Sequence, residues 1–468
     1  MQMSGILEMT DGGISVQILP DSALQASNLT VDAVTATSLD LRVTQATTLL
    51  TPGQDDTSPW QLHGGRLVLD GTTLAVPPGS FTLEAAVADI NHLGPANADL
   101  VFSAQNPQIQ WESFIPEISS VNSHFLLSGD VLDNQGKLTL TGIPTELGFS
   151  VQTDLQTETT RFDIEATESL ELYDVFEAFR SFLVDPQTSM AIISGQADIK
   201  IEGAIDENED LSVELDTRLS ELSGNYDGVV FSDAGGNISL GLTGAAASGS
   251  ASINVPSLEY GIELTELGCN LDIDLPEDQD FPVFVFDSCN GSTLGSRFEA
   301  NNFTYDMNNP ENSIRLEISG LDIASVLEVQ SFEGLEATGK LDGSLPMPLD
   351  QRGLSISGGE LRNQSDGNIR YQIDPDQAAV VSNPLTDVVM SALSDFNYDL
   401  LTATVDYAPE GDLFVDFHIQ GSSPNFENNR RVHLNINSEQ NVLSLLQSLE
   451  YTGNLNQQID DKVRNNLE

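Results

Sequence analysis

Residues 403–417, ATVDYAPEGDLFVDF, contain the pattern that decides the fold. Apolar residues occupy alternate positions on both sides of a short loop: Ala403, Val405, Tyr407, Leu413, Val415 and Phe417. Successive residues of a strand point to opposite faces, so each half of the stretch has one apolar and one polar face. The loop between them, Ala408–Asp412, contains Pro409 and Gly411, which are residues that favour turns. The stretch therefore predicts an antiparallel β-hairpin.

The same two-residue period recurs along the whole chain, with Gly, Asn and Asp between the runs. This spacing is typical of sandwiches and barrels. However, the chain has only two Trp, and aromatic residues make up 6% of it. A long meandering sheet fits these features better than a thick core does. The sequence therefore predicts a mainly β protein, with an elongated, curled, groove-like antiparallel sheet and a few short helices.

Three segments have apolar residues at helical spacing. The first is Leu172–Leu183, with Val175, Phe176, Phe179 and Phe182 on its stripe. The second follows an N-cap at Asn383 with Pro384 at the first helical position, and its stripe is Leu385, Val388, Val389, Ala392, Leu393 and Phe396. For the third, Ser438 is the predicted cap, and the buried residues are Val442, Leu445, Leu446 and Leu449. The tail 457–467 reads as a frayed helix.

A weak internal repeat suggests how the chain is organised. Tyr173–Leu183 and Leu321–Val329 each read as a short helix that leads into an amphipathic hairpin. Repeated units that cannot bury their own apolar faces stack on their neighbours. We therefore predict three segments: residues 1–170, 171–320 and 321–468.

Net charge limits the possible partners. Lys and Arg total 17 against 72 Asp and Glu, which gives a net charge of −55. A field of this sign repels nucleic acid and anionic lipid surfaces. The chain has no run of about 18 apolar residues that would span a membrane. Its first 20 residues lack the features of a signal peptide, so we expect a piece of a longer protein or a chain that has lost its start.

The two cysteines, Cys269 and Cys289, lie in successive strand-like runs. An even pair is compatible with a disulfide in an oxidising compartment. The alternative is two unpaired small residues. Neither cysteine belongs to a zinc-binding pattern.

The chain contains no catalytic, cofactor or metal-binding motif. Its five histidines are scattered, without HExxH or nucleophile-elbow patterns. Asp206, Asn208 and Asp210 resemble the start of a calcium loop, but Leu211 stands where that loop needs Gly. An acidic hairpin turn is the better interpretation. We therefore predict a protein that is not an enzyme and has neither a cofactor nor a metal site.

The C-terminal part, from about Phe332 to Leu449, resembles the YdbH family of AsmA-like envelope proteins. The motifs that carry the resemblance are Gly334–Pro346, Ile356–Leu361, Gly367–Tyr371, Ala392–Tyr398, Val405–Tyr407, Gly421–Asn425, Val432–Asn437, Glu439–Val442 and Leu445–Leu449. The resemblance implies a periplasmic protein of Gram-negative bacteria, tethered to the inner membrane by an N-terminal helix that this chain lacks. It also implies a curled sheet with an apolar interior that helps move phospholipids between the inner and outer membranes.

The leading hypothesis is therefore a groove segment that binds phospholipid acyl chains. The candidate lining residues are Ile199, Ile201, Ile314, Leu316, Ile369, Tyr371, Val405, Leu413, Val415 and Phe417. A small envelope lipoprotein or an outer-membrane protein is a candidate partner. The alternatives are a structural or adhesive envelope β-protein without a ligand and, ranked last, a hydrolase acting on envelope polymers.

Overall fold

The computed structural model describes residues 4–10, 13–31, 34–52, 60–76, 79–94, 96–111, 117–183, 189–208, 210–226, 228–260, 262–279, 281–330, 334–350, 353–372, 391–426 and 429–442. The chain divides into two compact units. Unit 1 comprises Met1–Asp185, Ser194–Arg218 and Ser239–Ala245, and unit 2 comprises Pro186–Ile193, Leu219–Ile238 and Ala246–Glu468.

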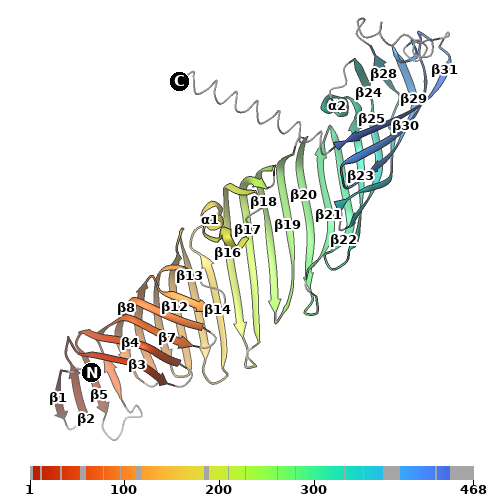
Figure 1. The fold of residues 1–468 in the computed structure, drawn as a ribbon. Coiled ribbons are helices and arrows are strands. Elements are labelled where there is room, and N and C mark those ends of the chain that lie inside the picture. The colour runs from red at the N-terminus through yellow and green to blue at the C-terminus, as the bar shows by residue number, and fades with distance from the viewer. Residues whose placement is uncertain are drawn as a thin grey trace, which may run out of the picture. The chain divides into compact units, whose positions relative to one another are not determined.

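Strands dominate both units, and within the described part of the chain they belong to one antiparallel sheet of 31 strands that does not close into a barrel. The first fifteen are β1 (Gly5–Thr10), β2 (Gly13–Ile18), β3 (Ala23–Val31), β4 (Val34–Gln45), β5 (Thr47–Pro52), β6 (Gln61–His63), β7 (Arg66–Val76), β8 (Gly79–Leu93), β9 (Asn97–Gln105), β10 (Gln108–Trp111), β11 (Ile118–Ser128), β12 (Val131–Leu140), β13 (Ile143–Asp154), β14 (Thr159–Ala166) and β15 (Leu170–Glu171) (Figure 1). The remaining strands are β16 (Met190–Ile205), β17 (Leu211–Tyr226), β18 (Val229–Thr243), β19 (Ala246–Tyr260), β20 (Ile262–Leu275), β21 (Val283–Thr293), β22 (Ser296–Asp306), β23 (Glu311–Asp322), β24 (Leu335–Thr338), β25 (Lys340–Asp350), β26 (Gly353–Leu354), β27 (Ile356–Asn363), β28 (Gly367–Tyr371), β29 (Phe396–Tyr407), β30 (Asp412–Ser422) and β31 (Arg431–Asn441). The prediction of a mainly β, open antiparallel fold is confirmed.

The hairpin predicted from residues 403–417 forms in the expected register. Tyr407 pairs with Leu413, Val405 with Val415, and Ala403 with Phe417. Directly opposed residues lie on the same face of a sheet, so the apolar residues of both strands share one face.

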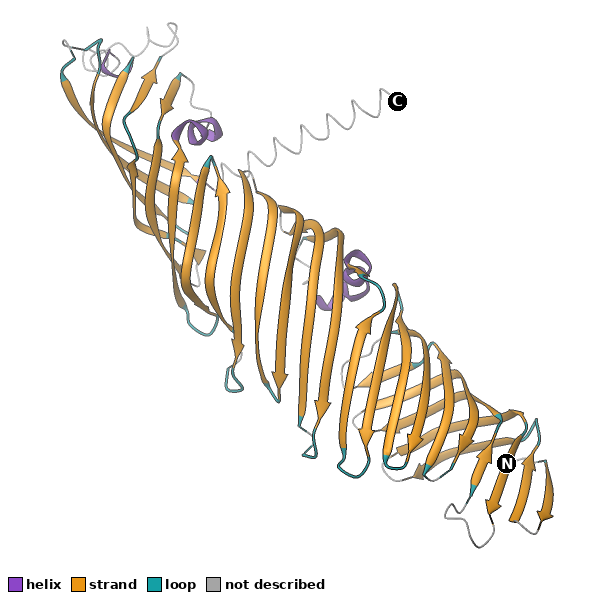
Figure 2. Cartoon of the chain, turned by 180° about the vertical axis from the view of Figure 1, so that it is seen from behind, coloured by secondary structure: helices purple, strands orange, loops and turns teal. Residues whose placement is uncertain are grey.

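Two of the helices lie wholly within the described residues, and Figure 2 shows them as short purple segments beside the strand ends. They are α1 (Leu172–Leu183) and α2 (Ile323–Gln330). The bounds of α1 are those predicted from its stripe, and Phe176 is 4% exposed. No helix in the described residues is both long and apolar enough to cross a membrane.

Two details of the helix predictions were wrong. Residues 391–393 are helical, but Phe396 begins β29, where Phe396 and Tyr398 alternate with polar neighbours. Ser438 does not cap a helix: it lies inside β31, opposite Val415 of β30. Residues 383–390, Leu445, Leu446, Leu449 and the tail 457–467 lie outside the described residues.

The acidic segment after β16 forms a turn. One carboxylate oxygen of Asp206 accepts the backbone N–H groups of Asn208 (2.8 Å) and Asp210 (3.0 Å). These hydrogen bonds stabilise the ionised carboxylate and lower the pKa of Asp206. Asp206 is thus used to close the turn, as the hairpin interpretation predicted.

Packed apolar clusters occur in both units but are small. In unit 1, Leu83, Ala86 and Ala104 are buried together against Leu69 and Phe102. In unit 2, the cluster near the C-terminal end consists of Ala337, Leu341, Ile369, Phe396, Tyr398, Leu401 and Ile419, and we call it the C-terminal cluster. The three predicted segments 1–170, 171–320 and 321–468 remain a prediction.

Candidate functional site

Two neighbouring rows of residues show how unit 2 separates its faces. The first row, followed through the register from β22 to β31, is Phe298, Ile318, Gly343, Leu361, Ala403, Phe417 and Ile436. The adjacent row, one residue away on each strand, is Glu299, Glu317, Ser344, Glu360, Thr404, Asp416 and Asn437. We call the side of the first row the apolar face and the other side the polar face. Charge is confined to the second row.

The apolar face continues in the strands that precede β22. Leu271 of β20 is opposite both Ala251 and Phe286, and Phe286 is opposite Phe303. The rings of Phe286 and Phe303 stack with their centroids 4.4 Å apart, and those of Phe284 and Tyr305 lie 6.3 Å apart. Aromatic side chains thus form a ladder across β21 and β22.

Much of this apolar face is only half-buried. Five side chains of the apolar face keep part of their surface exposed: Phe284, Phe286, Phe298, Phe303 and Ile318. The rows to which they belong contain no charged residue. Ile253, on the same face of β19 as the buried Ala251, is 44% exposed. In an ordinary protein core such side chains would be covered. Unit 2 therefore presents a large apolar surface outside its packed cluster.

Unit 1 has the same separation of faces. Its apolar row runs through Leu67, Ala88, Phe102, Ser123, Gly136, Phe149, Ile164 and Ile201. The neighbouring row is Arg66, Asp89, Val101, His124, Gln135, Ser150, Asp163 and Glu202. The apolar row of unit 1 contains no charged residue either.

Phenylalanine rings cover glycines on the apolar faces. A Cβ atom added to Gly136 or Gly203 would collide with the ring of Phe149 or Phe162, respectively, on the neighbouring strand. Gly291 has the same relation to Phe298 in unit 2. A ring lying over a glycine fills the gap that the missing side chain leaves, so these stretches of apolar face are smooth.

The candidate lining residues fall into three groups. Ile199 and Ile201 are half-buried on the apolar side of unit 1. Ile314, Leu316, Leu413, Val415 and Phe417 are half-buried on the apolar face of unit 2. Val405 is on that face but only 6% exposed, Ile369 is 8% exposed within the C-terminal cluster, and Tyr371 is opposite Leu335. The first two groups therefore present the accessible apolar surface.

Two hollows in the surface are lined by residues of both the polar and the apolar rows. One, of about 890 Å³, is lined in unit 2 by residues that include Glu299, Glu317, Ser344 and Glu360. Another, of about 580 Å³ in unit 1, includes Lys137, Asp163 and Glu165. Burying an acyl chain against ionised carboxylates leaves their charge unsolvated at a high free-energy cost. The carboxylates therefore disfavour acyl chains in these hollows.

The cysteines lie on the apolar face of unit 2. Cys269 of β20 and Cys289 of β21 are directly opposed, and a disulfide joins them with their Cα atoms 4.2 Å apart. The bond covalently links two strands of the region where the aromatic ladder lies.

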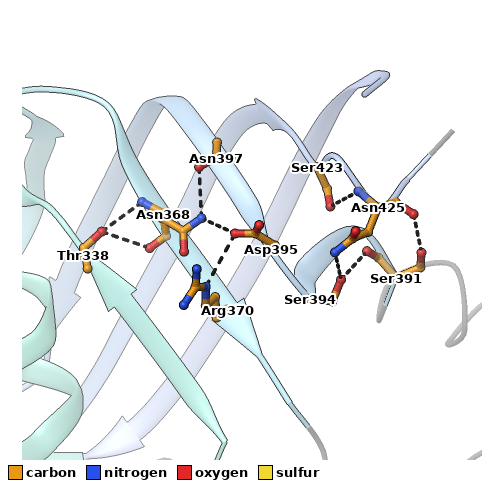
Figure 3. Close-up of polar contacts among 9 residues, drawn as sticks. All are labelled: Thr338, Asn368, Arg370, Ser391, Ser394, Asp395, Asn397, Ser423 and Asn425. Carbon is orange, nitrogen blue, oxygen red and sulfur yellow. Dashed lines mark hydrogen bonds and ion pairs between the residues drawn. The ribbon is translucent and has the colours of Figure 1, made fainter. Parts of the chain in front are cut away.

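Sequence motifs from distant parts of the C-terminal region meet in the polar contacts of Figure 3. The Nδ2 group of Asn368 donates to Asp395 (2.8 Å) and to Asn397 (3.1 Å), and Arg370 lies 3.6 Å from Asp395. These contacts connect β28 with the start of β29 through the two residues that flank the buried Phe396 in the sequence. They hold the strands that enclose the C-terminal cluster.

A second set of contacts in Figure 3 centres on Asn425. Its side-chain amide donates to the Ser394 hydroxyl (3.2 Å), and its backbone carbonyl accepts from the Ser391 hydroxyl (3.2 Å). Its backbone N–H donates to the hydroxyl of the fully buried Ser423 (3.4 Å). The Tyr398 hydroxyl donates to the backbone carbonyl of Thr338 (2.7 Å), and burial raises the pKa of Tyr398. The sequence contains these motifs, but it does not indicate the contacts of their polar residues, because the partners lie far apart in the chain.

Comparison with known proteins gives one family match. The family model described as YdbH-like, intermembrane phospholipid transport protein YdbH, matches residues 3–464. No curated protein and no solved structure gives a significant match. The match covers nearly the whole chain, well beyond the C-terminal part whose motifs resemble the family.

Proposed function

The chain belongs to the YdbH-like family of intermembrane phospholipid transport proteins, and from this premise we propose that its apolar faces hold acyl chains during transport. In this proposal the acyl chains lie along the half-buried apolar residues of each unit, while the head groups remain in water. The protein acts in the periplasm of a Gram-negative bacterium, tethered to the inner membrane. A small envelope lipoprotein or an outer-membrane protein is its partner.

The observation that carries the proposal is the row from Phe298 to Ile436, which contains no charged residue. Most residues of this row are half-buried, and the adjacent row contains four carboxylates. Each methylene that leaves water contributes about 0.8 kcal/mol. An acyl chain therefore gains several kcal/mol from a smooth apolar track without any specific ligand residue. The family is described by lipid transport rather than by a catalytic activity.

Two adjacent residues of β21 allow a matched test of which face meets lipid. Phe286 is half-buried on the apolar face, and its neighbour Val285 is 40% exposed on the polar side. A photo-crosslinking amino acid at Phe286 is expected to capture phospholipid in living cells, whereas the same group at Val285 is not. The readout is the mass of the crosslinked protein. Equal capture at both positions would contradict the proposal.

A further inference from the structure

Three of the five histidines gather on the polar side of unit 1, away from the apolar face. His63 of β6 is directly opposite His92 of β8, and His92 is opposite Asp99 of β9. His124 of β11 lies 2.9 Å from Asp99. Sequence spacing did not reveal this group, because strand pairing brings together residues from four separate runs.

Local backbone geometry sets the position of His63. Gly64 and Gly65 follow it with φ angles of +64° and +120°, which side-chain-bearing residues rarely adopt. A Cβ atom on Gly65 would also lie 2.6 Å from the Cβ of Thr47. This corner lets β6 and β7 both pair with β8, and it leaves His63 at the end of β6 beside His92.

The two imidazole rings face each other through their Nδ1 atoms. The Nδ1–Nδ1 distance is 3.5 Å, and the ring centroids are 4.9 Å apart. Nε2 of His63 lies 3.1 Å from the side-chain oxygen of Gln61, which only accepts hydrogen bonds. The tautomer of His63 that donates from Nε2 to this oxygen leaves its Nδ1 lone pair directed toward His92.

The two Nδ1 atoms are within hydrogen-bonding distance, and the same separation fits a shared metal ion. Zinc–nitrogen bonds are about 2.0–2.1 Å long and arranged tetrahedrally, which places two imidazole nitrogens about 3.4 Å apart. We propose that His63 and His92 bind one divalent transition-metal ion of the zinc, nickel or copper class through their Nδ1 atoms. The two imidazoles are the protein ligands of this site, and no group of three or more metal-binding side chains occurs among the described residues.

The surroundings of the pair favour a cation. Asp99 accepts hydrogen bonds from His124 (2.9 Å) and Asn91 (3.0 Å), and these contacts lower its pKa and keep it ionised next to His92. The net charge of the chain is −55, which raises the local concentration of divalent ions. Imidazole distinguishes transition metals from magnesium and calcium, which prefer oxygen ligands.

Zinc titration of the full chain, without an affinity tag and in excess magnesium, tests the proposal. Magnesium occupies carboxylate sites, so one zinc ion per chain is expected to bind at the histidine pair. His63→Asn and His92→Asn are each expected to weaken zinc binding at least tenfold. The control is His433→Asn, an exposed histidine in β31 of unit 2, which is expected to leave the affinity unchanged. Equal zinc affinity in all three variants, or no zinc binding by the wild-type chain, would overturn the proposal.

A second measurement does not depend on variants. Diethyl pyrocarbonate modifies accessible imidazoles, and mass spectrometry locates the modified residues. Zinc is expected to protect His63 and His92 while His433 continues to react. Unchanged modification of His63 and His92 in the presence of zinc would also contradict the site.

Discussion

The double variant Ile314→Asp/Leu316→Asp is expected to lose at least four-fifths of the phospholipid that co-purifies with the wild-type chain. Both side chains are half-buried on the apolar face of β23, opposite Met347 and Leu345, and neither belongs to the C-terminal cluster. A carboxylate in contact with hydrocarbon costs about 3 kcal/mol, which corresponds to a roughly hundredfold weaker local interaction. Quantitative lipid mass spectrometry of the purified chains gives the ratio.

The same strand supplies the control for this experiment. Ser313 and Ser319 are exposed on the polar face of β23, so Ser313→Asp/Ser319→Asp adds the same charge to the opposite side. This variant is expected to retain its lipid. Circular dichroism must show that both variants remain folded. Equal lipid content in the two folded variants would show that acyl chains do not lie along this face.

Phe396→Ala is expected to lower the free energy of unfolding by about 3–5 kcal/mol, the usual cost of emptying a buried aromatic site. Phe396 is fully buried in the C-terminal cluster, with Ile369 directly opposite. The polar contacts of Asn368, Arg370 and Asp395 hold the strands around this position, which limits their collapse into the cavity. Urea unfolding monitored by circular dichroism measures the change.

Phe414→Ala is the matched control, because Phe414 is 43% exposed on the polar side of β30. Its removal is expected to change the free energy of unfolding by no more than about 0.5 kcal/mol. If the two variants were equally stable, the C-terminal cluster would not be a packed core. The accessible apolar surface would then have to be redefined.

Local pattern predicted the fold class well, because both the hairpin at 403–417 and helix α1 depend on short-range periodicity. It failed where two patterns overlapped. Phe396 fits a helical stripe, but it also begins an alternating run with Tyr398, and strand pairing decided in favour of β29. Ser438 is a good helix cap in isolation, yet the ladder with β30 continues past it as far as Asn441.

Bulges explain why the sequence could not define the lining completely. Asn302 of β22 adopts a φ of +54°. Before it, the even-numbered residues Phe298 and Ala300 lie on the less exposed face; after it, the odd-numbered residues Phe303 and Tyr305 do. Such a shift reverses the face of every following residue. The burial of Ile369 and Val405 was also invisible, because it depends on contacts with distant strands. The lipid-lining role of the ten candidate residues remains a prediction, and the half-buried residues among them are the accessible ones.

The amount of phospholipid carried by the purified full chain tests the central claim most directly. After gentle extraction from cells and removal of free lipid, native mass spectrometry counts the bound molecules. The proposal predicts one or more phospholipids per folded chain, and their loss from the Ile314→Asp/Leu316→Asp variant but not from its serine control. A folded wild-type chain that is free of lipid, and that takes up none from phospholipid vesicles, would contradict the proposal and favour a structural role in the envelope.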